Sequence, residues 1–143
     1  MSVWGKRFGL LVVFVWFLAG GVGHFLNTAF FVQIVPPYVP WPLAAVYVSG
    51  AFELLGALGI LVPRLRQAAG NGLFALTIAV TPANVYMWQH PDLFPGVSPN
   101  ALTMRLVLQV MLLVCIWVST RTPAQPALPT ASRPGGADPS GAG

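Results

Sequence analysis

Charged residues are scarce in this sequence, and acidic residues are the scarcest. Only 7% of its 143 residues are charged, with three acidic side chains against seven lysines and arginines. A soluble domain usually carries about 25% charged residues, so this composition does not suit a surface that faces water. The basic residues form no clustered patch, which argues against nucleic-acid binding.

Cysteine and histidine are also nearly absent. The one cysteine, Cys115, excludes an intramolecular disulfide, a C-x-x-C redox pair and a cysteine-based metal cluster. The two histidines lie in different halves of the chain without partners at ligand spacing, so we expect no haem or zinc. No glycine-rich phosphate loop is present. We therefore expect no metal and no intrinsic cofactor.

Long apolar runs are abundant, and 56% of the residues are hydrophobic. Runs of about 18 or more apolar residues predict transmembrane helices. The sequence predicts an all-α integral membrane four-helix bundle, with spans at about Phe8–Leu26, Pro42–Val62, Ala69–Trp88 and Ala101–Ser119. This bundle forms one domain, residues 1–120. The Pro-, Gly- and Ala-rich residues 121–143 predict a disordered cytoplasmic tail.

The basic residues predict the orientation of the bundle. They flank alternate ends of the spans, whereas the loops 27–41 and 89–100 contain no lysine or arginine; the flanking residues are Lys6, Arg7, Arg64, Arg66 and Arg121. The positive-inside rule then places both termini in the cytoplasm, with the protein in the plasma membrane. A cleaved signal peptide is the alternative for the first span, but its length and the charge alternation favour retention.

The first outer loop is apolar and rich in proline. Pro36, Pro37 and Pro40 predict that no regular helix forms between Asn27 and Trp41. We expect this loop to be either a stiff connector or a lid that lies along the outer interface.

Polar residues mark a candidate site. Glu53 lies in the middle of an apolar span, where a charge is costly and is usually paired or functional. From the helical rise of about 1.5 Å per residue, the other spans place their polar residues between the midplane and the outer surface. The candidate ligand-binding or proton-relay residues are His24, Glu53, Asn84, Arg105 and Gln109. We expect them to line a cavity with an apolar wall of Phe25, Phe52 and Tyr86, and we assign no catalytic residue.

Purely structural roles remain open for these residues. Arg105 could extend to the outer headgroups, or it could pair inward with Glu53, directly or through Gln109 or water. Glu53 could belong to a structural ion pair or hydrogen-bond a neighbouring helix. His24 could be a histidine at the interface.

Asn84 has a structural alternative as well, because it follows a proline within its span. Pro82 lacks an N–H group and frees the carbonyl of Ile78. Asn84 or Thr81 could satisfy that carbonyl.

Several motifs resemble those of the DoxX-like membrane proteins. Residues 20–25 (GGVGHF) resemble a G-x-x-H-F motif, 35–40 (VPPYVP) a proline-rich outer loop, and 49–56 (SGAFELLG) an S-G-x-x-E-x-x-G helix. Pro63-Arg64 with Ala69-Gly70 resembles the inner turn, and residues 82–84 resemble a P-A-N element. The resemblance covers about residues 8–118 and implies a four-helix membrane bundle. The matching motifs contain His24, Glu53 and Asn84. Arg105 and Gln109 lie outside these motifs and are candidates because of their depth in the fourth span and their shared helix face.

The function expected from this resemblance is that of a redox-associated membrane subunit, which binds a quinone or a small sulfur compound in the outer half of the bundle. The alternatives are a non-enzymatic accessory or chaperone-like assembly protein and a small proton-coupled transporter that uses Glu53. Whether the chain is an enzyme stays open. The expected partners are the lipid bilayer and a membrane or soluble redox protein, and self-association stays open.

Overall fold

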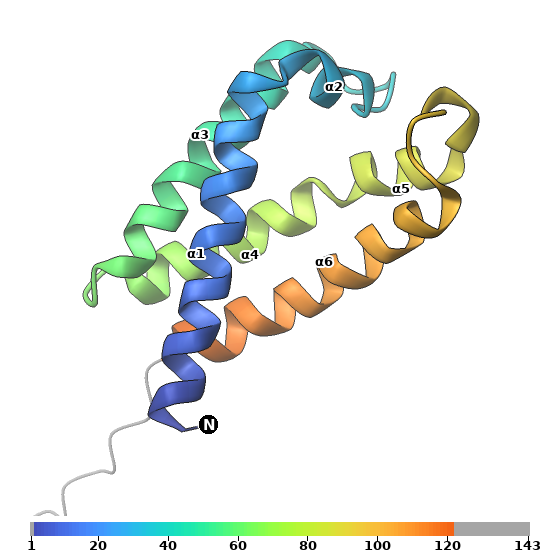
Figure 1. The fold of residues 1–143 in the computed structure, drawn as a ribbon. Coiled ribbons are helices and arrows are strands. Elements are labelled where there is room, and N and C mark those ends of the chain that lie inside the picture. The colour runs from blue at the N-terminus through green and yellow to red at the C-terminus, as the bar shows by residue number, and fades with distance from the viewer. Residues whose placement is uncertain (1, 122–143) are drawn as a thin grey trace, which may run out of the picture.

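A computed structural model describes residues 2–121, and this part of the chain is all-α. It contains six α-helices and one short 3-10 helix, with no strand in the described range (Figure 1). Apart from Arg121, the predicted disordered tail lies outside the described residues.

Three long helices correspond to three of the predicted spans. They are α1 (Val3–Leu26), α3 (Pro42–Leu61) and α6 (Pro99–Thr120), and each is long and apolar enough to cross a membrane. Among the described residues no other helix meets both conditions. In lipid a helix satisfies its own backbone groups, so such runs fold as continuous helices. The chain is therefore a multi-pass membrane protein by the length and composition of these helices.

Serine caps explain why two of these helices begin earlier than predicted. The side chain of Ser2 accepts a hydrogen bond from the backbone N–H of Gly5, so α1 begins at Val3 rather than near Phe8. Ser98 does the same for α6, where Pro99 occupies the first turn without needing an N–H partner.

The predicted third span is not one helix. It is divided into α4 (Arg66–Ala79) and α5 (Thr81–Gln89), separated by Val80. Pro82 lies in the first turn of α5, where its ring and missing N–H do not break helical hydrogen bonds. The proline thus ends one helix and starts the next.

The expectation that prolines prevent a regular helix in the first loop was wrong for its beginning. A short helix, α2 (Thr28–Gln33), follows α1 directly and ends before Pro36. Proline restricts only itself and the preceding residue, so two turns fit upstream. The second loop contains the 3-10 helix η1 (Pro91–Leu93).

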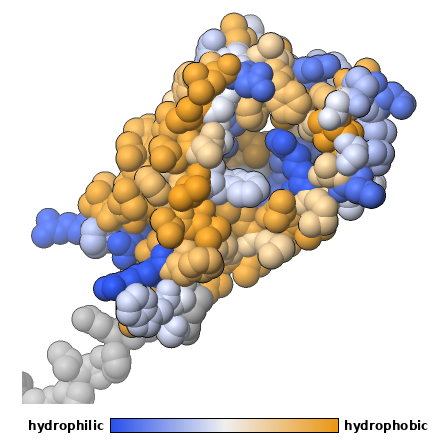
Figure 2. All heavy atoms as spheres, in the orientation of Figure 1, coloured by the Kyte–Doolittle hydropathy of each residue, from blue (hydrophilic) through white to orange (hydrophobic). Residues whose placement is uncertain are grey.

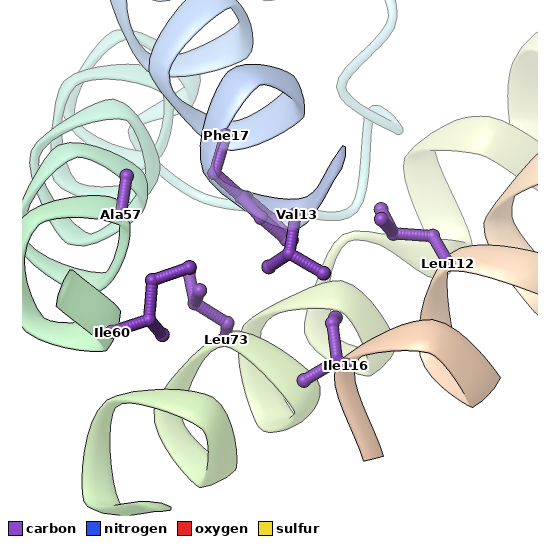
Figure 3. Packing of buried hydrophobic residues seen from close by; sticks show 7 residues of the cluster. All are labelled: Val13, Phe17, Ala57, Ile60, Leu73, Leu112 and Ile116. Carbon is purple, nitrogen blue, oxygen red and sulfur yellow. The ribbon is translucent and has the colours of Figure 1, made fainter. Parts of the chain in front are cut away.

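The helices pack most closely where the basic residues lie. The start of α1, the α3–α4 turn and the end of α6 share one end of the bundle, which we call the basic end (Figure 1). A core of buried side chains from α1, α3, α4 and α6 fills this half; it comprises Val13, Phe17, Ala57, Ile60, Leu73, Leu112 and Ile116 (Figure 3). We call it the basic-end core.

A second core closes the opposite end, which we call the loop end. Ile34, next to α2, packs with Met87 of α5, Phe94 after η1 and Leu102 of α6. Gln33 also donates a side-chain hydrogen bond to the carbonyl of Leu93 at 3.2 Å. This loop-end core connects the first loop to the second, although α1 and α3 have diverged from α5 and α6 there (Figure 1).

Candidate functional site

A cavity of about 1340 Å³ lies between the two cores. Its lining comes from α1, α3, α4, α5, α6 and the segment that contains α2, and it includes all five predicted site residues: His24, Glu53, Asn84, Arg105 and Gln109. The space-filling view shows a hollow with hydrophilic residues in its wall, next to a mostly hydrophobic part of the surface (Figure 2). The structure thus brings these five residues to one cavity.

His24 and Glu53 form one polar wall of the cavity. His24 Nδ1 lies 2.8 Å from the carbonyl oxygen of Gly20, and because a carbonyl can only accept, the ring donates an Nδ1–H there. The same nitrogen lies 3.5 Å from Glu53 Oε2. The ring of Phe31 stacks on His24, with 3.9 Å between the ring centroids. These contacts fix the imidazole plane beside the carboxyl group.

Two glycines allow this close approach of α1 and α3. A Cβ atom on Gly20 would lie 2.7 Å from Glu53 Oε2, and one on Gly50 would lie 2.7 Å from the Cβ of His24. Glycine costs a helix about 1 kcal/mol relative to alanine, but small residues let helices in lipid pack closely. At these two positions the absent side chains create the space that the His24–Glu53 pair occupies.

The carboxyl group of Glu53 is incompletely satisfied. Glu53 is only 8% exposed, and its Oε2 atom has no hydrogen-bond partner within residues 2–121. A buried polar atom without a partner costs roughly 1–3 kcal/mol and is rare in folded proteins. A proton, a water molecule or a ligand in the adjoining cavity would lower that cost.

The opposite wall is a chain of hydrogen bonds that orients Arg105. The Nε–H of Arg105 donates to Asn84 Oδ1 at 2.7 Å. The amide nitrogen of Asn84 donates to Gln109 Oε1. The amide nitrogen of Gln109 donates to Thr81 Oγ1 and, at 3.2 Å, to the carbonyl of Thr77. Because the carbonyl of Thr77 can only accept, the amide nitrogen of Gln109 must donate to it. This assignment fixes which group donates and which accepts in the other hydrogen bonds of this series.

This chain also stabilises the division between α4 and α5. The carbonyl of Thr77 receives the Thr81 hydroxyl at 3.0 Å as well as the Gln109 amide. Carbonyls in the last turn of a helix lack intrahelical partners. Side chains thus donate hydrogen bonds to the carbonyl of Thr77, not to that of Ile78 as predicted. Of the two predicted donors, Thr81 makes such a bond and Asn84 does not.

Arg105 turns toward the cavity but forms no direct pair with Glu53. Within the described chain Glu53 lies within 4.0 Å of His24, and no carboxylate lies within 4.0 Å of Arg105. Its half-buried side chain bonds Asn84 instead of extending toward the loop end. The alternative in which Arg105 pairs directly with Glu53 was therefore wrong. Coupling of the two residues through water or Gln109 stays a prediction.

The predicted apolar wall was wrong as well. Phe25 and Phe52 are 45% and 58% exposed and do not line the cavity. Tyr86 borders a separate shallow groove beside α5. Aromatic and aliphatic side chains from other positions form the wall, among them Trp16, Phe30, Phe31, Met87 and Leu102. Depth in a span identifies polar candidates, but the helix face that meets a cavity depends on the packing.

The proline-rich loop and Cys115 differ in their positions relative to the cavity. Pro36 lines the cavity, whereas Pro37 does not, so only part of the proline-rich loop covers it. Cys115 lies beside Gly9, toward the basic end. Within the described residues no cluster of three or more His, Cys, Asp or Glu could hold a metal ion.

Comparisons with known proteins leave the function open. Neither the curated proteins nor the solved structures contain a match to this chain. The sequence matches one family over residues 13–120, a stretch that includes the five candidate residues His24, Glu53, Asn84, Arg105 and Gln109. The chain therefore belongs to the family described as Domain of unknown function (DUF8561).

Proposed function

We propose that the chain is a redox-associated subunit of the plasma membrane that binds a membrane-dissolved quinone in this cavity. The DoxX-like motifs around His24, Glu53 and Asn84 support a redox association. The observation that carries the proposal is the cavity itself. It is mostly apolar, has polar groups on two walls, and leaves Oε2 of a buried carboxyl without a partner. Ligand sites commonly combine an apolar lining with a few placed polar groups.

The two polar walls suit a quinone head. The guanidinium of Arg105, held at Nε by Asn84, has further N–H groups to donate to a quinone oxygen. Glu53 and His24 can hold or pass protons on the other wall. Reduction of a quinone to a quinol takes up two electrons and two protons. A partner redox protein would supply the electrons, and the Glu53–His24 pair would carry protons to the head.

The proposed topology has four spans and two cytoplasmic ends. The broken run from Arg66 to Gln89 would be the third of the four spans along the chain, and the basic end would face the cytoplasm. Cysteine labelling tests this in a Cys115→Ser background. We expect Asn100→Cys to react from outside intact cells and Gln67→Cys to react only after permeabilisation; both positions are exposed. The reverse pattern would refute the orientation.

Binding of a tritiated decyl-benzoquinone to the protein in nanodiscs tests the function. Because hydrogen bonds to charged groups contribute about 1.5–3 kcal/mol, Arg105→Gln should weaken the Kd about tenfold or more. Arg64→Gln is the matched control, since Arg64 is exposed at the basic end and does not line the cavity. Uptake no greater than that of empty nanodiscs would refute the proposal.

One observation favours a second candidate, an accessory or assembly protein. The chain from Arg105 through Asn84 and Gln109 joins α6 to α5 without any ligand. A protein whose polar groups only specify helix pairing needs such bonds and no more. In that case Arg105→Gln would destabilise the fold, and the protein would show no saturable quinone binding.

A further inference from the structure

The cavity is closed toward the basic end of the bundle, and the loop-end core covers part of its other end. At the basic end Ile116 and Leu73 of the core are 0% and 1% exposed, and at the loop end Met87 and Leu102 are 1% and 2% exposed. Packed cores of this kind leave few voids larger than a water molecule. A ligand therefore has no open path along the bundle axis from the basic end, whereas at the loop end the lining residues Tyr38 and Ala101 are exposed.

The side of the cavity is open between α1 and α6. On α1 the lining residues Val15 and Trp16 are 53% and 45% exposed, and on α6 Met104 and Leu108 are 53% and 38% exposed. A residue that both lines a cavity and is exposed marks its mouth. Ala19 is also exposed, and we call these five residues the α1–α6 seam; the exposed lining residues Leu11 and Val12 of α1 continue it toward the basic end.

Packing explains why the seam opens. Near the basic end α1 touches α6, where a Cβ atom on Gly9 would collide with the side chain of Ser119. From this contact the two helices diverge toward the loop end (Figure 1). On the left of the hollow the surface is mostly hydrophobic, whereas hydrophilic residues lie on its right (Figure 2). The residues of the seam are apolar and lie within two helices of membrane-spanning length, so the mouth faces lipid rather than water.

We infer that the ligand enters and leaves sideways from the bilayer through the α1–α6 seam, and that its apolar chain stays in the seam while its head reaches Arg105 and Glu53. This inference rests on the proposed function and narrows it. The ligand is an amphiphile with one compact polar head and a long apolar chain. A water-soluble sulfur compound does not fit this route, because nothing in an apolar, lipid-facing path would attract it.

Arg105 explains the choice of the α1–α6 seam over the other side of the cavity. The lining between α3 and α4 also includes exposed residues, Val48 and Ala79. However, Arg105 lies three residues before the seam residue Leu108 on α6, a spacing that makes the two side chains neighbours on the helix surface. A head bound to Arg105 therefore has the α1–α6 seam as the adjacent apolar path for its chain.

Photolabelling tests the position of the chain. The probe is a decyl-benzoquinone with a diazirine at the end of its chain, added to the full-length protein in nanodiscs. We expect labelling at seam residues that excess unlabelled decyl-benzoquinone displaces. Displaceable labelling at Val48 or Ala79, or on α2, would overturn the route while leaving the proposed function intact. No displaceable labelling anywhere would refute the proposed function itself, and the route with it.

A blocked seam tests the route kinetically. Ala19→Trp fills the mouth, and Val22→Trp is the matched control because Val22 is an exposed residue of α1 that does not line the cavity. We expect Ala19→Trp to slow both quinone association and dissociation about tenfold, with a nearly unchanged Kd. If Ala19→Trp does not fold, the smaller change Leu108→Phe takes its place. Unchanged rates in a folded seam variant would overturn the inference.

Discussion

Gln109 is the residue on which the polar wall of the cavity depends, so Gln109→Leu is a sharp perturbation. Gln109 is 8% exposed and makes hydrogen bonds with Asn84, Thr81 and the carbonyl of Thr77. Leucine has a similar volume and no polar group. The substitution therefore removes the bonds without opening a large cavity.

The expected loss follows from which groups remain satisfied. The carbonyl of Thr77 keeps its bond from the Thr81 hydroxyl, so the amide donor of Asn84 alone loses its described partner. Hydrogen bonds between membrane helices average about 0.6 kcal/mol, and an orphaned buried donor costs roughly 1–3 kcal/mol. Burial of leucine offsets part of this loss. We expect Gln109→Leu to lower the free energy of unfolding by about 1–3 kcal/mol.

Reversible unfolding in mixed detergent micelles measures this loss. Gln67→Leu is the matched control, because Gln67 is exposed on α4 and its side chain makes no hydrogen bond within the described residues. It should change stability by no more than about 0.5 kcal/mol. Equal stabilities of the two variants would refute the reasoning, since Gln109 would then contribute nothing through its bonds.

Two further predictions concern the close packing and the charges of the site. Gly50→Ala should destabilise the protein by about 1–3 kcal/mol, because its Cβ would press on α1, whereas Gly72→Ala, with nothing within 4 Å of its Cβ, should be neutral or stabilise by up to about 1 kcal/mol in the same unfolding assay. Similar effects at both glycines would argue against the tight α1–α3 contact. In double-mutant cycles of stability, the coupling of Arg105 with Asn84 should exceed that of Arg105 with Glu53, because the structure has a hydrogen bond in the first pair and no ion pair in the second. A larger coupling of Arg105 with Glu53 would show that the two charges meet directly.

Local rules were sufficient to predict much of the fold. The apolar runs predicted three spans whose ends differ from α1, α3 and α6 by a few residues, because a helix in lipid must satisfy its own backbone. The same rules failed where neighbours decide. Pro82 signals a disturbance, but the full separation of α4 from α5 depends on Thr81 and Gln109, which bond the carbonyl of Thr77. The short helix α2 packs its flanking residue Ile34 into the loop-end core, a contact that its own sequence does not signal.

The sequence by itself determined where along its helix each polar residue lies, because the rise of a helix is fixed. That sufficed to select five residues that line one cavity. Only the tertiary structure decided their partners: Arg105 bonds Asn84, and Glu53 lies beside His24. The physical reason is rotational. A helix that is apolar on every side gives little indication of which face points inward, and contacts such as that of Gly20 with Glu53 set this angle only when the helices meet.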